Sequence, residues 1–185
     1  MSNIIQQIES LFERRGHCQY GDEAVSQWQH AAQCAQLAIE ASSSDATVVA
    51  ALLHDIGHIV GAESLPENCE SNLDDLHESV GHKFLANHFP ASIVDPIRLH
   101  VAAKRYLCTT QPSYQSNLSP TSLKSFMDQG AQMSRDELAA FESEPHCEAA
   151  IELRQWDDLA KDPAKPNPSF HEFTAHIQSV LNSTD

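Results

Sequence analysis

The sequence lacks the long apolar segments that a membrane protein needs. Its 185 residues contain no run of roughly 18 or more apolar side chains, the length that crosses a bilayer as a helix. The first residues, MSNIIQQIESLFERR, carry acidic and polar side chains where a signal peptide requires an apolar run. We therefore expect a cytoplasmic protein that has no membrane partner.

Paired cysteines are also missing. The five cysteines are scattered, odd in number and without a CxxC motif. This pattern argues against a disulfide scaffold and against a thiolate zinc site. We expect five ordinary thiols in a reduced compartment.

Basic residues are scarce. The chain has 11 lysines and arginines against 26 acidic residues, which gives a formal charge of −15. No basic stripe is available to bind the phosphates of a nucleic acid, so we expect no nucleic-acid partner. The same charge repels anionic membrane surfaces. An anionic small molecule could bind if the fold gathers several cations locally.

Glycines and long β-branched runs are few, so helices are expected to dominate. A polar loop is expected at residues 61–73. Because no internal repeat or low-complexity tract occurs, we predict one all-α domain over residues 1–185. The expected helices are 2–14, 22–41, a buried segment TVVAALLHDIGH capped by Asp45, 74–88, 91–107, a segment from Pro120 to near Gly130, a segment capped by Ser134 and Glu137, 145–160 and 169–182.

The dipeptide His54-Asp55 stands out because it lies within the apolar segment AALLHDIGH. An aspartate is seldom buried unless it is paired or bound to a cation. An adjacent imidazole and carboxylate suit a divalent or trivalent metal ion. Alone, the dipeptide is a weak signal, since a capped and solvated pair at a helix end has the same two residues.

Four further residues strengthen the metal interpretation: His30, His77, His100 and Asp157. The order H…HD…H…H…D is that of the HD superfamily, which implies an HD-domain helical bundle with its core at residues 20–160. Four imidazoles and two carboxylates suffice for two metal ions with a bridging carboxylate. No thiolate belongs to the set, which favours iron or manganese over structural zinc.

Several segments carry a closer resemblance. The PhnZ-type HD oxygenases, which cleave the C–P bond of 1-hydroxyphosphonates, have motifs similar to YGDEAVSQWQHAAQCA, VAALLHDIGH, HVAAKRYL, SPTSLKSFMDQGAQM and LRQWDD. The TmpB-type branch, with trimethylated substrates, and the inositol oxygenases share the metal chemistry. The resemblance implies conversion of 2-amino-1-hydroxyethylphosphonate, or an N-methylated analogue, to phosphate and a carboxylate such as glycine. It also implies O2 as co-substrate and an upstream hydroxylase as pathway partner.

The resemblance also implies a mixed-valent Fe(II)/Fe(III) pair and assigns its ligands. His30, His54 and Asp157 would bind one iron ion, and His77 and His100 would bind the other. Asp55 would bridge the two ions.

Seven residues are implied as substrate contacts. Lys104, one helical turn after His100, and Arg154, three residues before Asp157, would supply positive charge to the phosphonate. Lys104 and His58 are also the catalytic candidates. The full set is Tyr20, Glu23, His58, Lys104, Ser122, Gln129 and Arg154. Within it, Tyr20 and Glu23 would cover the site and recognise the substrate's amino group. The neighbours of these two residues depart from the family pattern, which leaves the methylation state of that amine open.

Other interpretations stay open at this point. Most HD proteins resemble metal-dependent phosphohydrolases, which would turn over a phosphate ester without O2. A degenerate HD module could bind a phosphorylated ligand for regulation. An inositol-type oxygenase would share the metal chemistry, but the cationic pair of Lys104 and Arg154 suits a phosphonate better than a neutral polyol.

Overall fold

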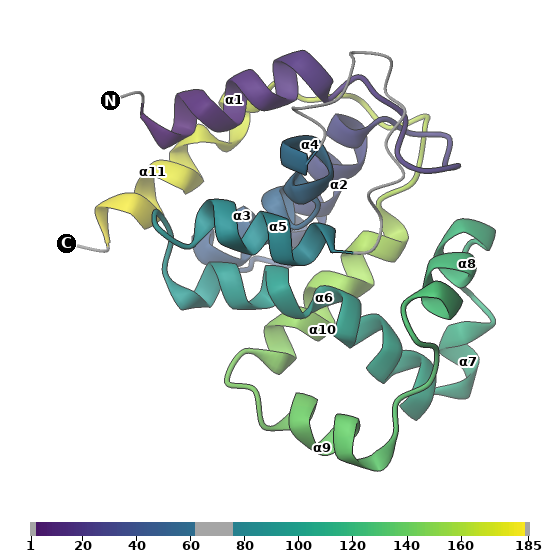
Figure 1. The fold of residues 1–185 in the computed structure, drawn as a ribbon. Coiled ribbons are helices and arrows are strands. Elements are labelled where there is room, and N and C mark those ends of the chain that lie inside the picture. Colours follow the sequence, from purple (N-terminus) through teal and green to yellow (C-terminus); the bar gives the residue numbers. More distant parts are fainter. Residues whose placement is uncertain (1–2, 62–75, 184–185) are drawn as a thin grey trace.

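The structure is a computed structural model that describes residues 3–61 and 76–183. These residues form a bundle of α-helices (Figure 1), which confirms the all-α prediction. They contain no strand, although an isolated bridge joins Gln19 to Ser26. The elements are α1 Ile4–Arg15, α2 Gln27–Glu40, α3 Asp45–Leu53, α4 Ile56–Gly61, α5 His77–Leu85, α6 Ala91–Thr110, α7 Pro112–Gln115, α8 Pro120–Asp128, α9 Arg135–Glu142, α10 Cys147–Leu159, the 3-10 helix η2 Phe170–Phe173 and α11 Thr174–Asn182.

Helix α3 lies at the centre of the bundle because nearly all of its side chains are apolar. Residues 48–53 are all buried, and the helix packs against α2, α6, α10 and α11. Burial of a valine or leucine side chain contributes about 1.5–3 kcal/mol. This packing fixes the end of α3 and therefore the position of the His54-Asp55 dipeptide that follows it.

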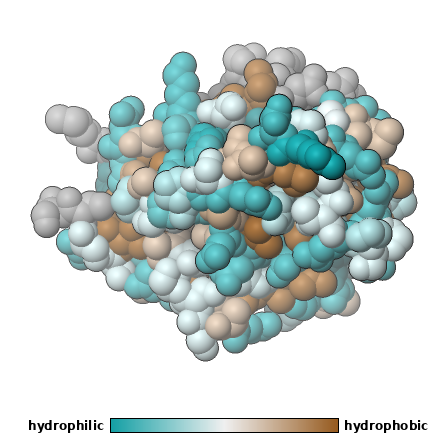
Figure 2. All heavy atoms as spheres, turned by 90° about the horizontal axis from the view of Figure 1, so that it is seen from below, coloured by the Kyte–Doolittle hydropathy of each residue, from teal (hydrophilic) through white to brown (hydrophobic). Residues whose placement is uncertain are grey.

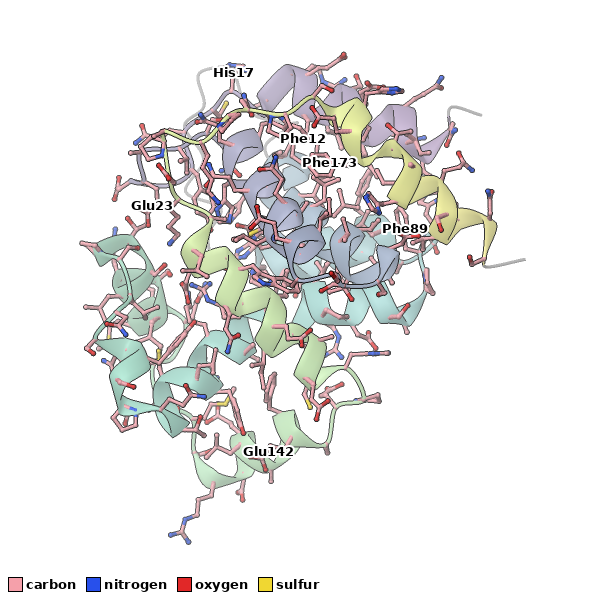
Figure 3. All side chains as sticks on the ribbon, turned by 180° about the vertical axis from the view of Figure 1, so that it is seen from behind. Phe12, His17, Glu23, Phe89, Glu142 and Phe173 are labelled. Carbon is pink, nitrogen blue, oxygen red and sulfur yellow. The ribbon has the colours of Figure 1, made fainter. Side chains whose placement is uncertain are left out.

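Helices α1 and α11 cover one end of the bundle (Figures 1 and 3). Phe12 of α1 meets Trp28 edge-on, with ring centroids 5.0 Å apart, and Trp28 lies 5.9 Å from the ring of Phe173. The helix expected at 2–14 is α1, and it buries one apolar face. Its buried residues are Ile4, Ile5, Ile8, Leu11 and Phe12.

Two predicted helix starts are wrong, and in both places a serine cap decides where the helix begins. The helix expected at 22–41 starts at Gln27, because Ser26 and Gln29 form a reciprocal capping box. Ser44 caps α3, whereas Asp45, the expected cap, is the first residue of the helix. The five residues before Ser26 are left in turns and bends at the edge of the bundle.

The later helices follow the sequence pattern more closely. Ser119 caps α8, with Pro120 in its first turn. Gly130 ends this segment with φ +101°, a conformation that favours glycine. Ser134 and Glu137 form the predicted capping box at the start of α9. The helix expected at 74–88 occupies His77–Leu85. Most of the loop expected at 61–73, residues 62–73, lies outside the described residues.

The surface is mostly polar on the face shown in Figure 2, where hydrophobic side chains form small separate areas. Within the described ranges, no helix is both long and apolar enough to span a bilayer. Three cysteines are free, Cys34, Cys108 and Cys147. Cys18 is disulfide-bonded, so the expectation of five free thiols is wrong.

Candidate metal centre

The six predicted ligands lie together in the interior of the bundle. His54 and Asp55 form a turn between α3 and α4, so the continuous helix expected for TVVAALLHDIGH breaks there. This break lets two adjacent residues direct their side chains into one space. Helices α2, α5, α6 and α10 supply the others. No member of the set is more than 6% exposed: His30, His54, Asp55, His77, His100 and Asp157.

Main-chain carbonyl groups orient three of the imidazoles. The Nδ1 atoms of His30, His54 and His100 contact carbonyl oxygens at 2.9, 2.8 and 2.6 Å. A carbonyl oxygen can only accept, so each Nδ1 carries the hydrogen. In a neutral ring the lone pair is then on Nε2. These three Nε2 atoms are therefore available as metal ligands.

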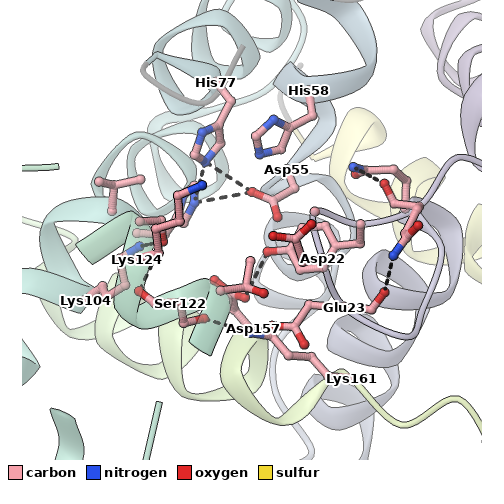
Figure 4. A pocket seen from close by; sticks show the side chains of 18 of the residues that line it. Asp22, Glu23, Asp55, His58, His77, Lys104, Ser122, Lys124, Asp157 and Lys161 are labelled. Carbon is pink, nitrogen blue, oxygen red and sulfur yellow. Dashed lines mark hydrogen bonds and ion pairs between the residues drawn. The ribbon is translucent and has the colours of Figure 1, made fainter. Parts of the chain in front are cut away.

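The Nε2 atoms meet in two pairs, and Asp55 stands between them. His30 Nε2 is 3.1 Å from His54 Nε2, and His77 Nε2 is 3.1 Å from His100 Nε2. Asp55 Oδ2 lies 3.5 and 3.2 Å from the first pair. Asp55 Oδ1 lies 3.3 and 3.4 Å from the second pair (Figure 4). One carboxylate thus presents one oxygen to each pair of nitrogens.

These distances fit metal coordination. Two nitrogen lone pairs that face each other at 3.1 Å repel unless a proton or a cation lies between them. Cis ligand atoms about 2.1 Å from one ion stand about 3 Å apart, close to the spacing in both pairs. Asp55 Oδ2 is buried and has no hydrogen-bond partner among the described residues. Asp157 Oδ1 adds a further oxygen, 3.4 Å from His30 Nε2. The donor set therefore fits one cation at each pair, with Asp55 shared.

The charges of the site favour cation binding. Burial opposes ionisation of Asp55, but His54 and its other histidine neighbours hold the pKa of this carboxyl well below its usual range. Arg154 does the same for the pKa of Asp157. Burial alone would lower the pKa of His30, yet the neighbouring carboxylates of Asp157 and Asp55 raise it to about 9. The two ionised carboxylates thus attract positive charge to the histidine nitrogens, whether a proton or a metal ion.

Two more potential donors lie beside the set. Cys34 is grouped with His30 and His54, and His58 with His77, each with donor atoms within 4.8 Å of one another. Burial raises the pKa of Cys34 well above its usual range, so the thiol stays protonated and is a weak ligand. Burial and the neighbouring His77 lower the pKa of His58 to about 3. The neutral ring of His58 stacks on His77, with ring centroids 4.0 Å apart.

A cavity of about 850 Å³ opens beside these ligands. Among the described residues, five basic and four acidic side chains line it. The local cluster of cations that an anionic ligand needs is therefore present. The basic residues are Arg15, Lys104, Lys124, Arg154 and Lys161, and the acidic ones are Asp22, Glu23, Asp55 and Asp157 (Figure 4).

Lys104, Ser122 and Gln129 all lie in the cavity wall. Lys104 is only 3% exposed, and its ammonium group donates to Ser125 Oγ at 2.7 Å. Ser122 is buried in the first turn of α8. Gln129 Oε1 is buried and has no hydrogen-bond partner among the described residues. The wall therefore presents a buried cation and polar groups to whatever fills the cavity.

Arg154 is more constrained than the sequence suggested. Its guanidinium donates to the carboxylates of Asp157 and Asp158. Its Nε also lies 3.3 Å from Tyr114 Oη, and its Nη2 lies 3.5 Å from Ser122 Oγ. Most of the five N–H groups are therefore directed at protein acceptors. Arg154 therefore lines the cavity as a charge held in place by protein acceptors. Its guanidinium group cannot bind an anion through two parallel hydrogen bonds.

Tyr20 and Glu23 lie before α2 and also line the cavity. Tyr20 stacks on His30 with ring centroids 3.8 Å apart, and its hydroxyl group lies 3.4 Å from Asp157 Oδ1. Glu23 accepts from Ser119 Oγ at 2.5 Å and from Lys161 Nζ at 3.0 Å. Tyr20 thus covers one histidine pair, and Glu23 is held by protein donors.

Four residues of this network were missed by the sequence analysis: Tyr114, Ser125, Asp158 and Lys161. Asp158 follows Arg154 by four residues on α10, a spacing at which a helix brings opposite charges together. That signal was present in LRQWDD. Lys161 lies beyond the end of α10, where no periodic pattern indicates which way a side chain points.

The fold and the ligand set together define the class of protein. The family described as "HD domain" matches residues 27–167, a range that contains all six candidate ligands. The chain therefore belongs to the HD-domain family.

Two similar proteins indicate a more specific group within the HD-domain family. Hydroxymethylphosphonate dioxygenase of Gimesia maris is 40% identical over 178 residues, covering 95% of this chain and 89% of that protein. The [1-hydroxy-2-(trimethylamino)ethyl]phosphonate dioxygenase (glycine-betaine-forming) of Leisingera caerulea is 36% identical over 180 residues, covering 97% and 91%. The expected resemblance to phosphonate oxygenases of the HD family is confirmed.

Proposed function

We propose that this chain is an iron-dependent oxygenase that uses O2 to cleave the C–P bond of a small 1-hydroxyphosphonate. The products would be phosphate and a carboxylate, glycine in the case of 2-amino-1-hydroxyethylphosphonate. The observation that carries the proposal is the position of the paired histidine nitrogens around Asp55, directly beside a cavity rich in cations. The two similar proteins, both named as dioxygenases of hydroxylated phosphonates, support it.

The proposed metal ligands divide into two groups. His30, His54 and Asp157 would hold one iron ion, His77 and His100 would hold the second, and Asp55 would bridge them. A mixed-valent Fe(II)/Fe(III) pair would supply the redox chemistry with O2.

The cavity residues would bind and orient the substrate. The Lys104 ammonium, fixed by Ser125, is a buried point charge for a phosphonate oxygen. Arg154, held between Asp157 and Asp158, would add positive charge and one remaining Nη1 N–H. His58, neutral in its buried place, can accept or donate one hydrogen bond beside His77. Holding the phosphonate at these groups would present C1 and its hydroxyl group to the metal ligands.

Ser122 and Gln129 would complete the phosphonate site. Ser122 Oγ accepts from Lys161 Nζ at 2.8 Å, which leaves its hydroxyl hydrogen for the substrate. Gln129 Oε1, which has no hydrogen-bond partner among the described residues, can accept a hydrogen bond from the substrate. Tyr20, stacked on His30, would exclude water from the first histidine pair. An upstream hydroxylase would have to install the 1-hydroxyl group, and we place both enzymes in the cytoplasm.

The proposal is tested by phosphate release from hydroxymethylphosphonate, 2-amino-1-hydroxyethylphosphonate and its N-trimethyl analogue. Iron-loaded protein is assayed in air and under anaerobic conditions, and O2 consumption is followed in parallel. We expect phosphate only in air, with equimolar O2 uptake. Phosphate or nucleotide esters hydrolysed anaerobically with Mn²⁺ or Mg²⁺, and no phosphate from the phosphonates, would show an HD phosphohydrolase instead.

A further inference from the structure

Lys161 contacts two other parts of the chain that lie at the cavity. It follows α10, and its Nζ atom lies 3.0 Å from Glu23 Oε1, which belongs to the turn before α2. The same nitrogen donates to the hydroxyl oxygens of Ser122 at 2.8 Å and Ser119 at 3.3 Å, both at the start of α8. Lys161 and Glu23 are only 12% and 14% exposed. Three separated parts of the chain therefore meet at one ion pair.

This ion pair uses the charge of Glu23. The carboxylate also accepts from Ser119 Oγ at 2.5 Å. Burial opposes its ionisation, but Ser119 and Lys161 together lower the pKa of Glu23. The ammonium group of Lys161 also lies 6.0 Å from the ring centroid of Tyr20. A cationic group that entered this part of the cavity would find Glu23 already paired with Lys161. The ring of Tyr20 lies near the same lysine.

We propose that Lys161 is a specificity-determining residue that selects against 1-hydroxyphosphonates with an ammonium group. The favoured substrates would carry a hydrogen or a small uncharged substituent on C1, as in hydroxymethylphosphonate. This inference rests on the proposed function and names the substrate class of the same site.

Among the described residues, the other acidic side chains that line the cavity do not replace Glu23. Asp55 and Asp157 face the histidine nitrogens, and Asp157 also accepts from Arg154. Asp22 lines the cavity but is exposed, so solvent screens its charge. A substrate ammonium near Glu23 would have to displace Lys161 or lie next to a like charge. Juxtaposed like charges in a poorly hydrated site reduce affinity by roughly 10- to 100-fold.

The test compares two substrates that differ in an aminomethyl group. The ratio of kcat/KM for hydroxymethylphosphonate to that for 2-amino-1-hydroxyethylphosphonate is measured for iron-loaded wild type and Lys161→Met. We expect the wild-type ratio to exceed about 10, and Lys161→Met to lower it by roughly 10-fold or more. Lys165→Met, four residues along and outside the cavity wall, should keep the wild-type ratio.

A second variant ties the effect to Glu23. If Lys161→Met frees the carboxylate for an ammonium, adding Glu23→Gln should remove the preference gained for the aminated substrate. A second measurement needs no variant: wild type should be inhibited more strongly by ethylphosphonate than by 2-aminoethylphosphonate. This comparison decides the question if Lys161→Met does not fold.

The outcomes are distinguishable. Phosphate release with the same ratio in wild type and Lys161→Met would overturn the role of Lys161 but leave the proposed function standing. A wild-type preference for the aminated substrate that is lost in Asp22→Asn would overturn it too, by assigning amine recognition to Asp22. No phosphate from any phosphonate in air would refute the proposed function, and this inference would fall with it.

Discussion

The contact between α4 and α5 gives a prediction that links packing directly to the candidate metal centre. Gly57 lies two residues after Asp55, on the face of α4 that meets α5. An alanine Cβ at this position would stand 1.8 Å from the carbonyl oxygen of His77 and 2.9 Å from the backbone nitrogen of Gly81. These are main-chain atoms, so no side-chain rotation can relieve the overlap. The start of α5 would have to move.

The size of that movement follows from the same distances. Ordinary contact of a Cβ atom begins near 3.4 Å, so the His77 carbonyl must retreat by about 1.6 Å. His77 Nε2 is now 3.3 Å from Asp55 Oδ1 and 3.1 Å from His100 Nε2, and both contacts would be lost. A displacement of about 1 Å in an active site can reduce turnover roughly 100-fold. Overpacking of this kind also costs about 1–3 kcal/mol, or about 2–12 °C in Tm for a chain of this length.

Gly57→Ala is measured by thermal unfolding, by the iron-to-protein ratio and by phosphate release in air. We expect a lower Tm, loss of about half of the bound iron, and activity reduced by roughly 100-fold. Gly81→Ala is the matched control, because its Cβ would have nothing closer than 3.4 Å. That variant should keep its iron and gain helix stability of up to about 1 kcal/mol. Wild-type iron content and activity in Gly57→Ala would refute the close approach of the two helices.

Two further predictions concern buried and surface charge. Arg154→Ala should raise KM for the phosphonate about 10-fold or more, and should lower stability by about 3–5 kcal/mol because Asp157 and Asp158 lose their cation. Asp158→Asn, which leaves Arg154 in place, should have smaller effects on both; equal effects in steady-state kinetics and urea unfolding would contradict the supporting role of Asp158. The exposed carboxyl of Glu137 has its pKa lowered from 4.5 to about 2, chiefly by the backbone N–H of Ser134 and by Arg105. Because the folded pKa is the lower one, this stabilisation is present above pH 4.5 and is lost as the pH falls toward 2. Glu137→Gln should therefore unfold with a weaker dependence on acid pH, which a series of thermal melts would detect.

The sequence predicted most of the helices because they depend on strong local patterns, whereas the candidate metal ligands came from the order H…HD…H…H…D and its resemblance to the HD superfamily. An apolar segment such as VVAALL can only be stable in the interior, and it brings the adjoining His54-Asp55 with it. The serine caps at positions 119 and 134 were equally clear. The errors occurred where two local solutions compete. The capping box of Ser26 and Gln29 starts α2 at Gln27, although residues 22–25 have a helical pattern. Ser44, and not Asp45, caps α3.

The cavity was less predictable because its residues depend on contacts between distant segments. The resemblance pointed to Lys104, Ser122, Gln129 and Arg154, and all four lie in its wall. No local pattern in the sequence indicated which oppositely charged residue would pair with each charged residue of the cavity. The carboxylates that hold Arg154 come from its own helix, but the lysine that holds Glu23 lies 138 residues away in the chain.

The distribution of charge also explains how so acidic a chain can bind an anion. At physiological ionic strength the Debye length is about 8 Å, so exposed carboxylates on the far side of the bundle contribute little to the potential in the cavity. The charges that line the cavity decide instead. Among the described residues these are five basic and four acidic side chains, and two of the acidic ones lie beside histidine nitrogens. Cations bound at those nitrogens would make the cavity strongly positive. A lysine next to Glu23 then has a clear effect, because it neutralises a carboxylate in the cavity wall that would otherwise attract an ammonium group. The same arrangement that attracts a dianionic phosphonate therefore disfavours a positively charged substituent on it.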